Sequence, residues 1–128
     1  MAATAAHILI VDDEPHLRNV LQRILEHEGY CVDTAADGRT ALDLVEKEAP
    51  DLLLLDIMMP GISGREVCHE VRRIAPATRV IYFTAKAEPM DPSALHELGQ
   101  EAEAVLAKPS TTRRIVSKIR EVLAKPPR

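Results

Sequence analysis

The chain has 128 residues, of which 46% are hydrophobic and 28% are charged, and its formal net charge at pH 7 is -4. A chain of this length forms one domain of ordinary size and buries roughly two thirds of its unfolded surface, so it needs no disulfide or structural metal to fold. No apolar run approaches the roughly 20 residues that span a bilayer, and the negative charge argues against direct nucleic-acid binding by the domain as a whole.

Short apolar segments alternate along the chain with longer, amphipathic ones. The short segments are rich in Val, Ile and Leu and are bounded by charged or turn residues, which is typical of parallel strands. Five strands are predicted, at residues 7–13, 30–36, 51–56, 79–85 and 103–108. Strands that alternate with helices in this way predict a parallel sheet with right-handed crossovers and helices on both faces.

Between the strands, apolar side chains recur at helical spacing, which predicts helices with one buried face. These helices cover the apolar positions within residues 17–25, 41–45, 67–74 and 115–123. A further short helix is predicted to start at Asp91-Pro92, a cap followed by a first-turn proline, and to reach about Leu98. Ser63 or Ser110 can cap the helix that follows it. We therefore predict an α/β fold with a doubly wound, five-stranded sheet in the order 2-1-3-4-5.

Polar residues stand at the ends of four predicted strands. Asp12 and Asp13 end the first strand, Asp56 the third, Thr84 the fourth and Lys108 the fifth. Ligands of an open doubly wound sheet bind outside the carboxyl ends of the strands, where the strand order reverses. Any one of these residues could simply be polar because strand ends face solvent. In the order 2-1-3-4-5, however, all five converge on one site at the carboxyl edge of the sheet, which we call the acidic mouth.

The three acids at this mouth need a cation. At about 4 Å and an effective dielectric of about 20, each pair of carboxylates repels by roughly 4 kcal/mol. Oxygen ligands without Cys or His select a hard ion, and few protein ligands favour Mg²⁺ over Ca²⁺. A metal and Lys108 on either side of one carboxylate would bind a phosphoryl group while that carboxylate acts as nucleophile and forms an acyl phosphate. Thr84 would donate its hydroxyl to the same oxygens.

Four segments, ILIVDDEP, DLLLLDIMMPGISG, VIYFTAK and LAKPS, resemble in order and spacing the signatures of the receiver domain of two-component response regulators. The most restrictive is D-x-x-M-P-G-x-x-G, from Asp56 to Gly64. The resemblance covers His7 to Leu123 and implies the flavodoxin-like (βα)5 receiver fold. It implies a single receiver domain over residues 1–128, with a core at about 7–124 and a tail or the start of a linker at 125–128.

The resemblance also implies a role for each acid. Asp56 would accept a phosphoryl group from a phosphohistidine on a sensor histidine kinase or a histidine phosphotransfer protein. Mg²⁺ would bind Asp13, Asp56 and the backbone carbonyl of Met58 directly, and Asp12 through water. The protein would catalyse its own phosphorylation and dephosphorylation without being a conventional enzyme.

The same resemblance implies a switch. Lys108 would pair with the phosphoryl oxygens, and its peptide bond to Pro109 is expected to be cis. Thr84 would move toward the phosphoryl group and carry the following loop with it, so that the surface around strands four and five and helices four and five changes. That surface is the expected site of a possible homodimer and of a downstream target that the sequence does not identify.

The sequence departs from the family pattern in three places near this surface. Val105 stands where the family often has an aromatic residue that moves with the threonine, so how the switch is detected stays open. The segment from Gly99 to Lys108, which contains QEAEA, is about two residues longer than usual. Ser110 replaces the frequent Phe. These changes leave the predicted chemistry in place and affect only the predicted output.

Two further side chains, Met58 and Lys86, should border the phosphoryl group. Neither is an amide or an acid that could orient an attacking water. We therefore hypothesise a slow intrinsic dephosphorylation, although both side chains could simply cover the site.

Other functions remain as alternatives. A pseudo-receiver that acts only as an interaction module commonly lacks the acids or the lysine, and here all five positions are filled. A haloacid dehalogenase-type phosphatase would need D-x-D-x-T, and DIMMP lacks the second Asp. A flavodoxin-like electron carrier would need a Gly-rich phosphate loop after the first strand, where this chain has VDDEPHL.

The remaining features are assigned no chemistry. Cys31 and Cys68 are expected to be small buried or half-buried side chains, and the pairs Arg72-Arg73 and Arg113-Arg114 are expected to be solvated helix faces. The segment MAATAAH lacks the features of a secretory signal, so a cytoplasmic location is expected. The sequence does not identify the stimulus, the cognate kinase or the output.

Overall fold

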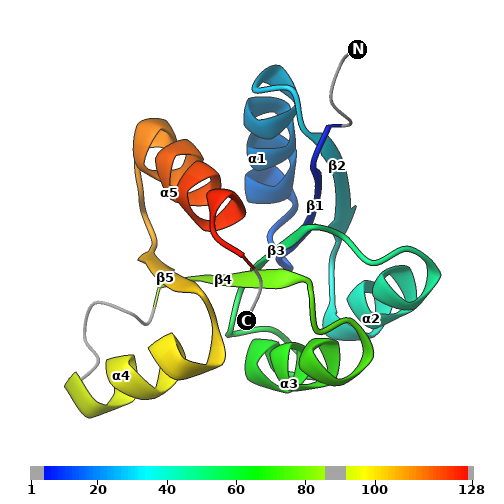
Figure 1. The fold of residues 1–128 in the computed structure, drawn as a ribbon, viewed down its shortest axis with the longest axis vertical. Helices are drawn as coiled ribbons and strands as arrows, with labels where there is room; N and C mark the ends of the chain where they lie inside the picture. The colour runs from blue at the N-terminus through cyan, green and yellow to red at the C-terminus, as the bar shows by residue number, and fades with distance from the viewer. Residues whose placement is uncertain (1–4, 86–91, 127–128) are drawn as a thin grey trace.

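A five-stranded parallel sheet forms the centre of the molecule (Figure 1). The computed structural model describes residues 5–85 and 92–126. The strands are β1 His7–Val11, β2 Cys31–Ala35, β3 Leu52–Leu55, β4 Arg79–Thr84 and β5 Ala104–Ala107. They pair in the order β2-β1-β3-β4-β5, with every pair parallel, which confirms the predicted sheet.

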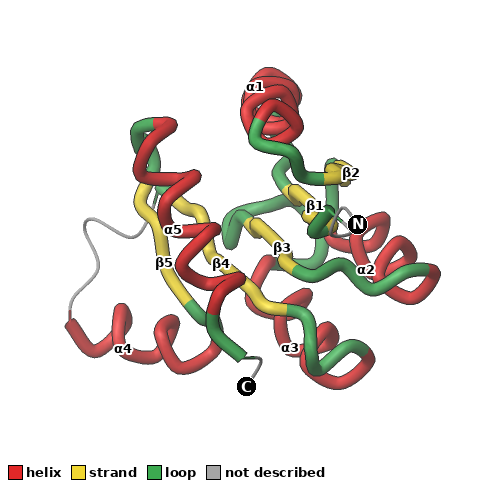
Figure 2. Tube along the Cα trace, turned by 45° about the horizontal axis from the view of Figure 1, so that its top comes forward, coloured by secondary structure: helices red, strands yellow, loops and turns green. Residues whose placement is uncertain are grey.

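Helices cover both faces of this sheet (Figures 1 and 2). The helices in the described residues are α1 Pro15–His27, α2 Gly38–Lys47, α3 Gly64–Ile74, α4 Pro92–Glu101 and α5 Thr112–Ala124. Helices α1 and α5 lie on one face, and α2, α3 and α4 lie on the other. The result is the doubly wound, three-layer arrangement that the sequence predicts.

The leucine strand β3 lies in the middle of the sheet, between β1 and β4. Its four leucines are each at most 1% exposed. Because successive side chains of a strand point to opposite faces, Leu53 and Leu55 join the core beneath α2 and α3, and Leu52 and Leu54 join the core beneath α1 and α5. Burial of each leucine side chain contributes roughly 1.5–3 kcal/mol to the stability of the fold. The strand that precedes Asp56 is therefore held rigidly from both sides.

The observed element ends differ from the predicted ones in two ways. The strands are one or two residues shorter than predicted, and β1 ends at Val11, so Asp12 and Asp13 lie just beyond it. Helix α4 continues to Glu101, past the predicted end at Leu98. Its last turn continues into the Ala102 amide, which donates to the Leu98 carbonyl at 3.0 Å. The predicted cap Asp91 lies outside the described residues.

The two predicted serine caps have different outcomes. Ser63 caps α3, since its side chain accepts a hydrogen bond from the Glu66 amide at 3.3 Å. Ser110 does not cap α5, because its hydroxyl donates to the Ala107 carbonyl at 2.6 Å. Thr111 caps α5 instead, with its Oγ1 atom accepting from the Arg114 amide at 3.1 Å.

The expectation that both cysteines are buried or half-buried is wrong for one of them. Cys68 on α3 is buried as expected, but Cys31 is exposed because β2 is an edge strand. Among the described helices, none is both long enough and apolar enough to span a bilayer.

Candidate functional site

Three carboxylates lie together at the carboxyl end of the sheet. Asp12 and Asp13 follow β1, and Asp56 follows the neighbouring strand β3. One oxygen from each carboxylate lies within 4.8 Å of an oxygen of each of the others. Asp12 and Asp56 are only 2% and 6% exposed, whereas Asp13 is exposed. The cluster therefore has a buried floor and one acid that faces solvent.

Each buried acid also fixes the loop that follows it. The Oδ1 atom of Asp12 accepts a hydrogen bond from the Glu14 amide at 2.9 Å. The Oδ1 atom of Asp56 accepts one from the Met58 amide at 3.2 Å. Aspartate side chains commonly stabilise turns by bonding the amide two residues ahead. Both carboxylates are thereby held in place before any ligand binds.

The loop after Asp56 returns to the site at Gly64. The Gly64 amide donates to the Ile57 carbonyl at 2.9 Å. A Cβ atom at position 64 would lie 2.1 Å from the Asp56 carbonyl oxygen and 2.7 Å from the Ile57 Cα atom. Only glycine fits this approach. Gly61 is required for a different reason, since its φ of 77° is in the left-handed region.

Lys108 lies between the two buried acids. Its Nζ atom is 2.6 Å from Oδ2 of Asp12 and 3.2 Å from Oδ2 of Asp56, and it lies 5.4 Å from the centre of the Phe83 ring. The Lys108–Pro109 peptide bond is cis, as expected. The sequence argument assigned Lys108 to phosphoryl oxygens and not to the acids, but in this structure it bridges the acids directly.

The protonation of the site follows from burial and these contacts. Burial raises the pKa of Asp56, Lys108 opposes that rise, and the nearby charge of Asp12 adds to it. Burial also disfavours the charged form of Lys108, but its hydrogen bond to Asp12 and the charges of both acids outweigh this, and its pKa is raised. The site therefore holds an ammonium group between two carboxylates that compete for it.

The other predicted residues lie around this cluster. Thr84 ends β4 and is fully buried, and its carbonyl accepts a hydrogen bond from the Lys108 amide at 3.0 Å. Met58 is 57% exposed, next to the acids along the chain. Val105 is partly buried on the side of the sheet that α4 covers. Lys86 lies outside the described residues.

Sequence reasoning missed Arg18, a residue of α1. Its Nη1 atom donates to the Asp12 carbonyl oxygen at 2.7 Å, so the guanidinium holds the backbone of the acidic loop from the helix side. The available signal was its spacing: Arg18 lies one helical turn after Glu14, whose carboxylate accepts from the Leu17 amide at 2.6 Å and caps the helix. Because Glu14 caps α1 directly after the acidic pair, the next turn of the helix, which carries Arg18, lies under the acidic loop.

The donor set of the cluster fits a hard divalent cation. It offers three carboxylates and, within the described residues, no thiolate or imidazole belongs to it. Oxygen ligands of this kind suit Mg²⁺. Asp13 makes no hydrogen bond or ion pair with the described part of the chain and is exposed, so its oxygens are open to a ligand from solvent.

Comparison with known proteins agrees with this geometry. The family model of the response regulator receiver domain matches residues 8–120. A CheY-like response regulator receiver domain protein from Methanospirillum hungatei is 32% identical, with a TM-score of 0.86 over 94% of this chain and 95% of that one. Chemotaxis protein CheY4 from Vibrio cholerae is 30% identical, with a TM-score of 0.84 over 93% of this chain and 99% of that one.

A third solved structure bears on the ligand. Response regulator protein TrrA from Thermotoga maritima, in complex with Mg²⁺ and BeF, is 36% identical, with a TM-score of 0.79 over 91% of this chain and 98% of that one. Receiver domains in general bind Mg²⁺ at an acidic pocket, and Asp12, Asp13 and Asp56 form such a pocket here. The family match, the sheet order and the acidic mouth together show that the chain belongs to the receiver domains of two-component response regulators.

Proposed function

We propose that the chain receives a phosphoryl group on the Asp56 carboxylate, in a Mg²⁺-dependent reaction. The donor is a phosphohistidine on a partner sensor histidine kinase or histidine phosphotransfer protein. The observation that carries this proposal is the convergence of three carboxylates with Lys108, whose ammonium lies within 3.2 Å of both buried acids. An interaction module alone has no need for such a costly buried charge cluster.

In the proposed reaction, a carboxylate oxygen of Asp56 attacks the phosphorus atom of the phosphohistidine. The P–O bond forms as the P–N bond breaks, and the electron pair of that bond goes to the imidazole nitrogen, which takes up a proton. Asp56 must be ionised to attack, and the charge of Lys108 favours that form. Lys108 then exchanges a carboxylate for a phosphoryl oxygen, an interaction that becomes stronger as charge develops there.

The residues proposed to hold Mg²⁺ are Asp13, Asp56 and the Met58 carbonyl, with Asp12 acting through water. Both oxygens of Asp12 are already engaged, by the Glu14 amide and by Lys108, which supports an indirect role. The exposure of Asp13 supports a direct one. When bound, the ion neutralises the acids and the phosphoryl oxygens.

Thr84 is proposed to move toward the phosphoryl group and to switch the surface of β4, β5, α4 and α5. Its carbonyl is already bonded to the Lys108 amide, so a shift of either strand end affects the other. We propose this surface for the downstream contact and for a possible homodimer. We place the domain in the cytoplasm, with residues 7–124 as its receiver core.

Incubation with acetyl phosphate and Mg²⁺ tests the proposed function. The intact mass is expected to rise by one phosphoryl group, and Asp56→Ala is expected to show no gain because the nucleophile is absent. Omitting Mg²⁺ should also suppress the gain. No mass gain in the parent protein would contradict the proposal and favour a pseudo-receiver that acts only through binding.

The lifetime of the phosphorylated state gives a second prediction. Met58 is exposed beside Asp56 and carries no group that could orient water. The lysine side chain at position 86 carries no such amide or acid either. The double variant Met58→Asn with Lys86→Glu is expected to lose its acyl phosphate several-fold faster than the parent. Decay is measured by intact mass after removal of the donor, and equal decay rates would refute the proposed protection.

A further inference from the structure

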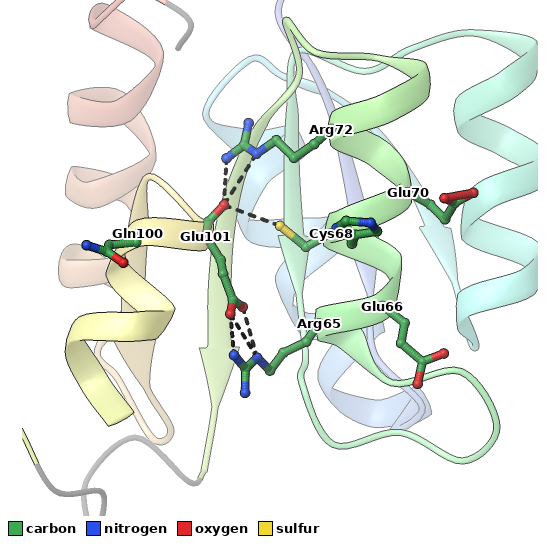
Figure 3. A pocket seen from close by; sticks show the side chains of 8 residues that line it. Arg65, Glu66, Cys68, Glu70, Arg72, Gln100 and Glu101 are labelled. Carbon is green, nitrogen blue, oxygen red and sulfur yellow. Dashed lines mark hydrogen bonds and ion pairs between the residues drawn. The ribbon is translucent and has the colours of Figure 1, made fainter. Parts of the chain in front are cut away.

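Glu101, the last residue of α4, joins α4 to α3 and β4. Its carboxylate accepts hydrogen bonds from the Arg65 guanidinium, through Nε at 2.9 and 3.1 Å and through Nη2, and from the Tyr82 hydroxyl at 2.8 Å. Its backbone carbonyl accepts from Nη2 of Arg72 at 3.0 Å and lies 3.4 Å from the Cys68 thiol. Figure 3 shows Arg65, Cys68 and Arg72 of α3 all directed at this one residue.

Arg72 extends the same set of contacts to the start of β4. Its Nη2 atom is 2.7 Å from the Glu103 carboxylate, which also accepts from the Val80 amide at 2.6 Å. The side chains of Arg72 and Glu103 are 24% and 12% exposed. The expectation that Arg72 lies on a solvated helix face is therefore wrong. Its partners lie outside α3, at the Thr78 carbonyl, at Glu101 and at Glu103. We call Arg65, Arg72, Tyr82, Glu101 and Glu103 the α3–α4 latch.

The latch lies at an open groove, beside the apolar contacts by which Leu98 and Ala102 join the core. A groove of about 730 Å³ separates the exposed parts of α3 and α4, and Arg65, Cys68, Arg72 and Glu101 line it. On this side of α4, polar contacts therefore hold the helix against α3. Each of these contacts has a fixed partner and direction. Such contacts form or break as a unit more readily than an interdigitated apolar core, which resists any displacement.

The charges in the latch are well defined. The hydrogen bonds from Arg65 hold the pKa of Glu101 below its usual range. Burial raises the pKa of Tyr82, so its hydroxyl stays protonated and donates to Glu101. Burial likewise raises the pKa of the Cys68 thiol. In the closed latch, the ionised Glu101 carboxylate therefore contacts a neutral tyrosine, and the Glu101 backbone carbonyl contacts a protonated thiol.

Strand β4 connects the latch to the acidic site. Val80 and Tyr82 face the core under α3 and α4, whereas Ile81 and Phe83 face the opposite core. By the same alternation, Thr84 lies on the Tyr82 face, two residues further toward the acids. A displacement of Thr84 therefore acts on the strand segment from which Tyr82 reaches Glu101.

We infer that the α3–α4 latch is coupled to the state of Asp56: it is closed in the unloaded protein and loosens when Asp56 carries a phosphoryl group. The inference rests on the proposed function, and it places a readout of phosphorylation at Glu101, the last residue of α4, within the Gly99–Lys108 segment that is longer than usual. A coupling of this kind is reciprocal. If loading Asp56 loosens the latch, breaking the latch must favour loading by the same factor.

Cys68 provides a reporter, since its thiol lies under the latch. A Cys31→Ser background removes the exposed thiol, and Cys68 is then alkylated with iodoacetamide. Mg²⁺ with beryllofluoride, a stable phosphoryl mimic, is expected to raise the alkylation rate at least threefold, and Asp56→Asn should abolish this rise. Native mass spectrometry of the same sample verifies that beryllofluoride is bound. An unchanged or slower rate with the ligand bound would overturn the coupling, whereas failure to bind or to be phosphorylated would instead count against the proposed function.

Arg65→Met provides the reciprocal test, because it removes the guanidinium that orients Glu101 without contacting the acids. It is expected to raise Cys68 alkylation in the unloaded protein and to tighten beryllofluoride binding by a similar factor. Arg73→Met is the matched control, since it breaks an ion pair with Glu70 inside α3. Ile119→Val, in the opposite core, controls for general destabilisation. Faster alkylation without tighter binding, or equal effects in the controls, would contradict the inference.

Discussion

Lys108→Met is expected to lower the free energy of unfolding by about 3–5 kcal/mol at neutral pH, the usual cost of removing one partner from a buried ion pair. The ammonium lies 2.6 Å and 3.2 Å from carboxylates whose side chains are only 3% and 7% exposed. Without it, two buried like charges face each other. Phosphorylation by acetyl phosphate should slow by about 10²-fold, as when one electrostatic donor is removed from an active site. Urea unfolding and intact-mass time courses measure the two effects.

The stability loss should depend on pH in a defined direction. Burial raises the pKa of Asp56 in the folded state, and removing Lys108 takes away an opposing contribution. A carboxyl group with a raised folded pKa stabilises the fold below its unfolded pKa, and this contribution is lost as pH rises through the folded value. The deficit of Lys108→Met should therefore shrink as the pH is lowered from about 7 toward the ordinary aspartate pKa of about 4.

The control for this variant is Lys118→Met, which breaks a surface pair with Glu121 on α5. A change of at most about 1 kcal/mol is expected there, because exposed ion pairs contribute little. If Lys108→Met were equally destabilised at every pH, the loss would come from packing of the new side chain and not from the unpaired carboxylates.

Gly64→Ala is expected to be the most damaging conservative change at the site. A methyl group there would lie 2.1 Å from the Asp56 carbonyl oxygen and 2.9 Å from its carbonyl carbon. These are backbone atoms, so the loop must move, at a cost of about 3 kcal/mol. The movement begins at the phosphoacceptor, and a displacement of about 1 Å can cost roughly 10²-fold in rate. Both stability and the phosphorylation rate should fall.

Gly61→Ala separates this clash from ordinary glycine strain. Its φ of 77° disfavours alanine, but a Cβ atom would meet nothing within 4 Å. A loss of about 1–2 kcal/mol is expected from the left-handed conformation alone, with little effect on the phosphorylation rate. A Gly64→Ala protein that was phosphorylated at the parental rate would show that the loop can yield without displacing Asp56.

Local patterns were sufficient to predict the sheet and the acidic mouth. Apolar runs and helical periodicity gave the alternation of strands and helices, because burial of one face imposes a period on the sequence. Parallel strands bring their carboxyl ends to one edge, so Asp12, Asp13, Asp56 and Lys108 could be placed together before any coordinates were known. Element ends were less predictable: Ser110 and Thr111 are both good caps, and only the Ala107 carbonyl near Ser110 decides between them.

The fold and the location of the acids could therefore be predicted from the amino-acid sequence alone, since both follow from strand order and from residues at strand ends. The partners of charged residues on helix faces depend instead on how the elements pack, which local patterns do not specify. Arg72 bonds to Glu101 and Glu103, which are 29 and 31 residues away, yet its helical position looks the same in sequence as that of the exposed Arg73. Charge pairing across elements has no period along the chain, because it depends on how far apart two packed helices come to lie. The α3–α4 latch is for this reason a property of the folded molecule.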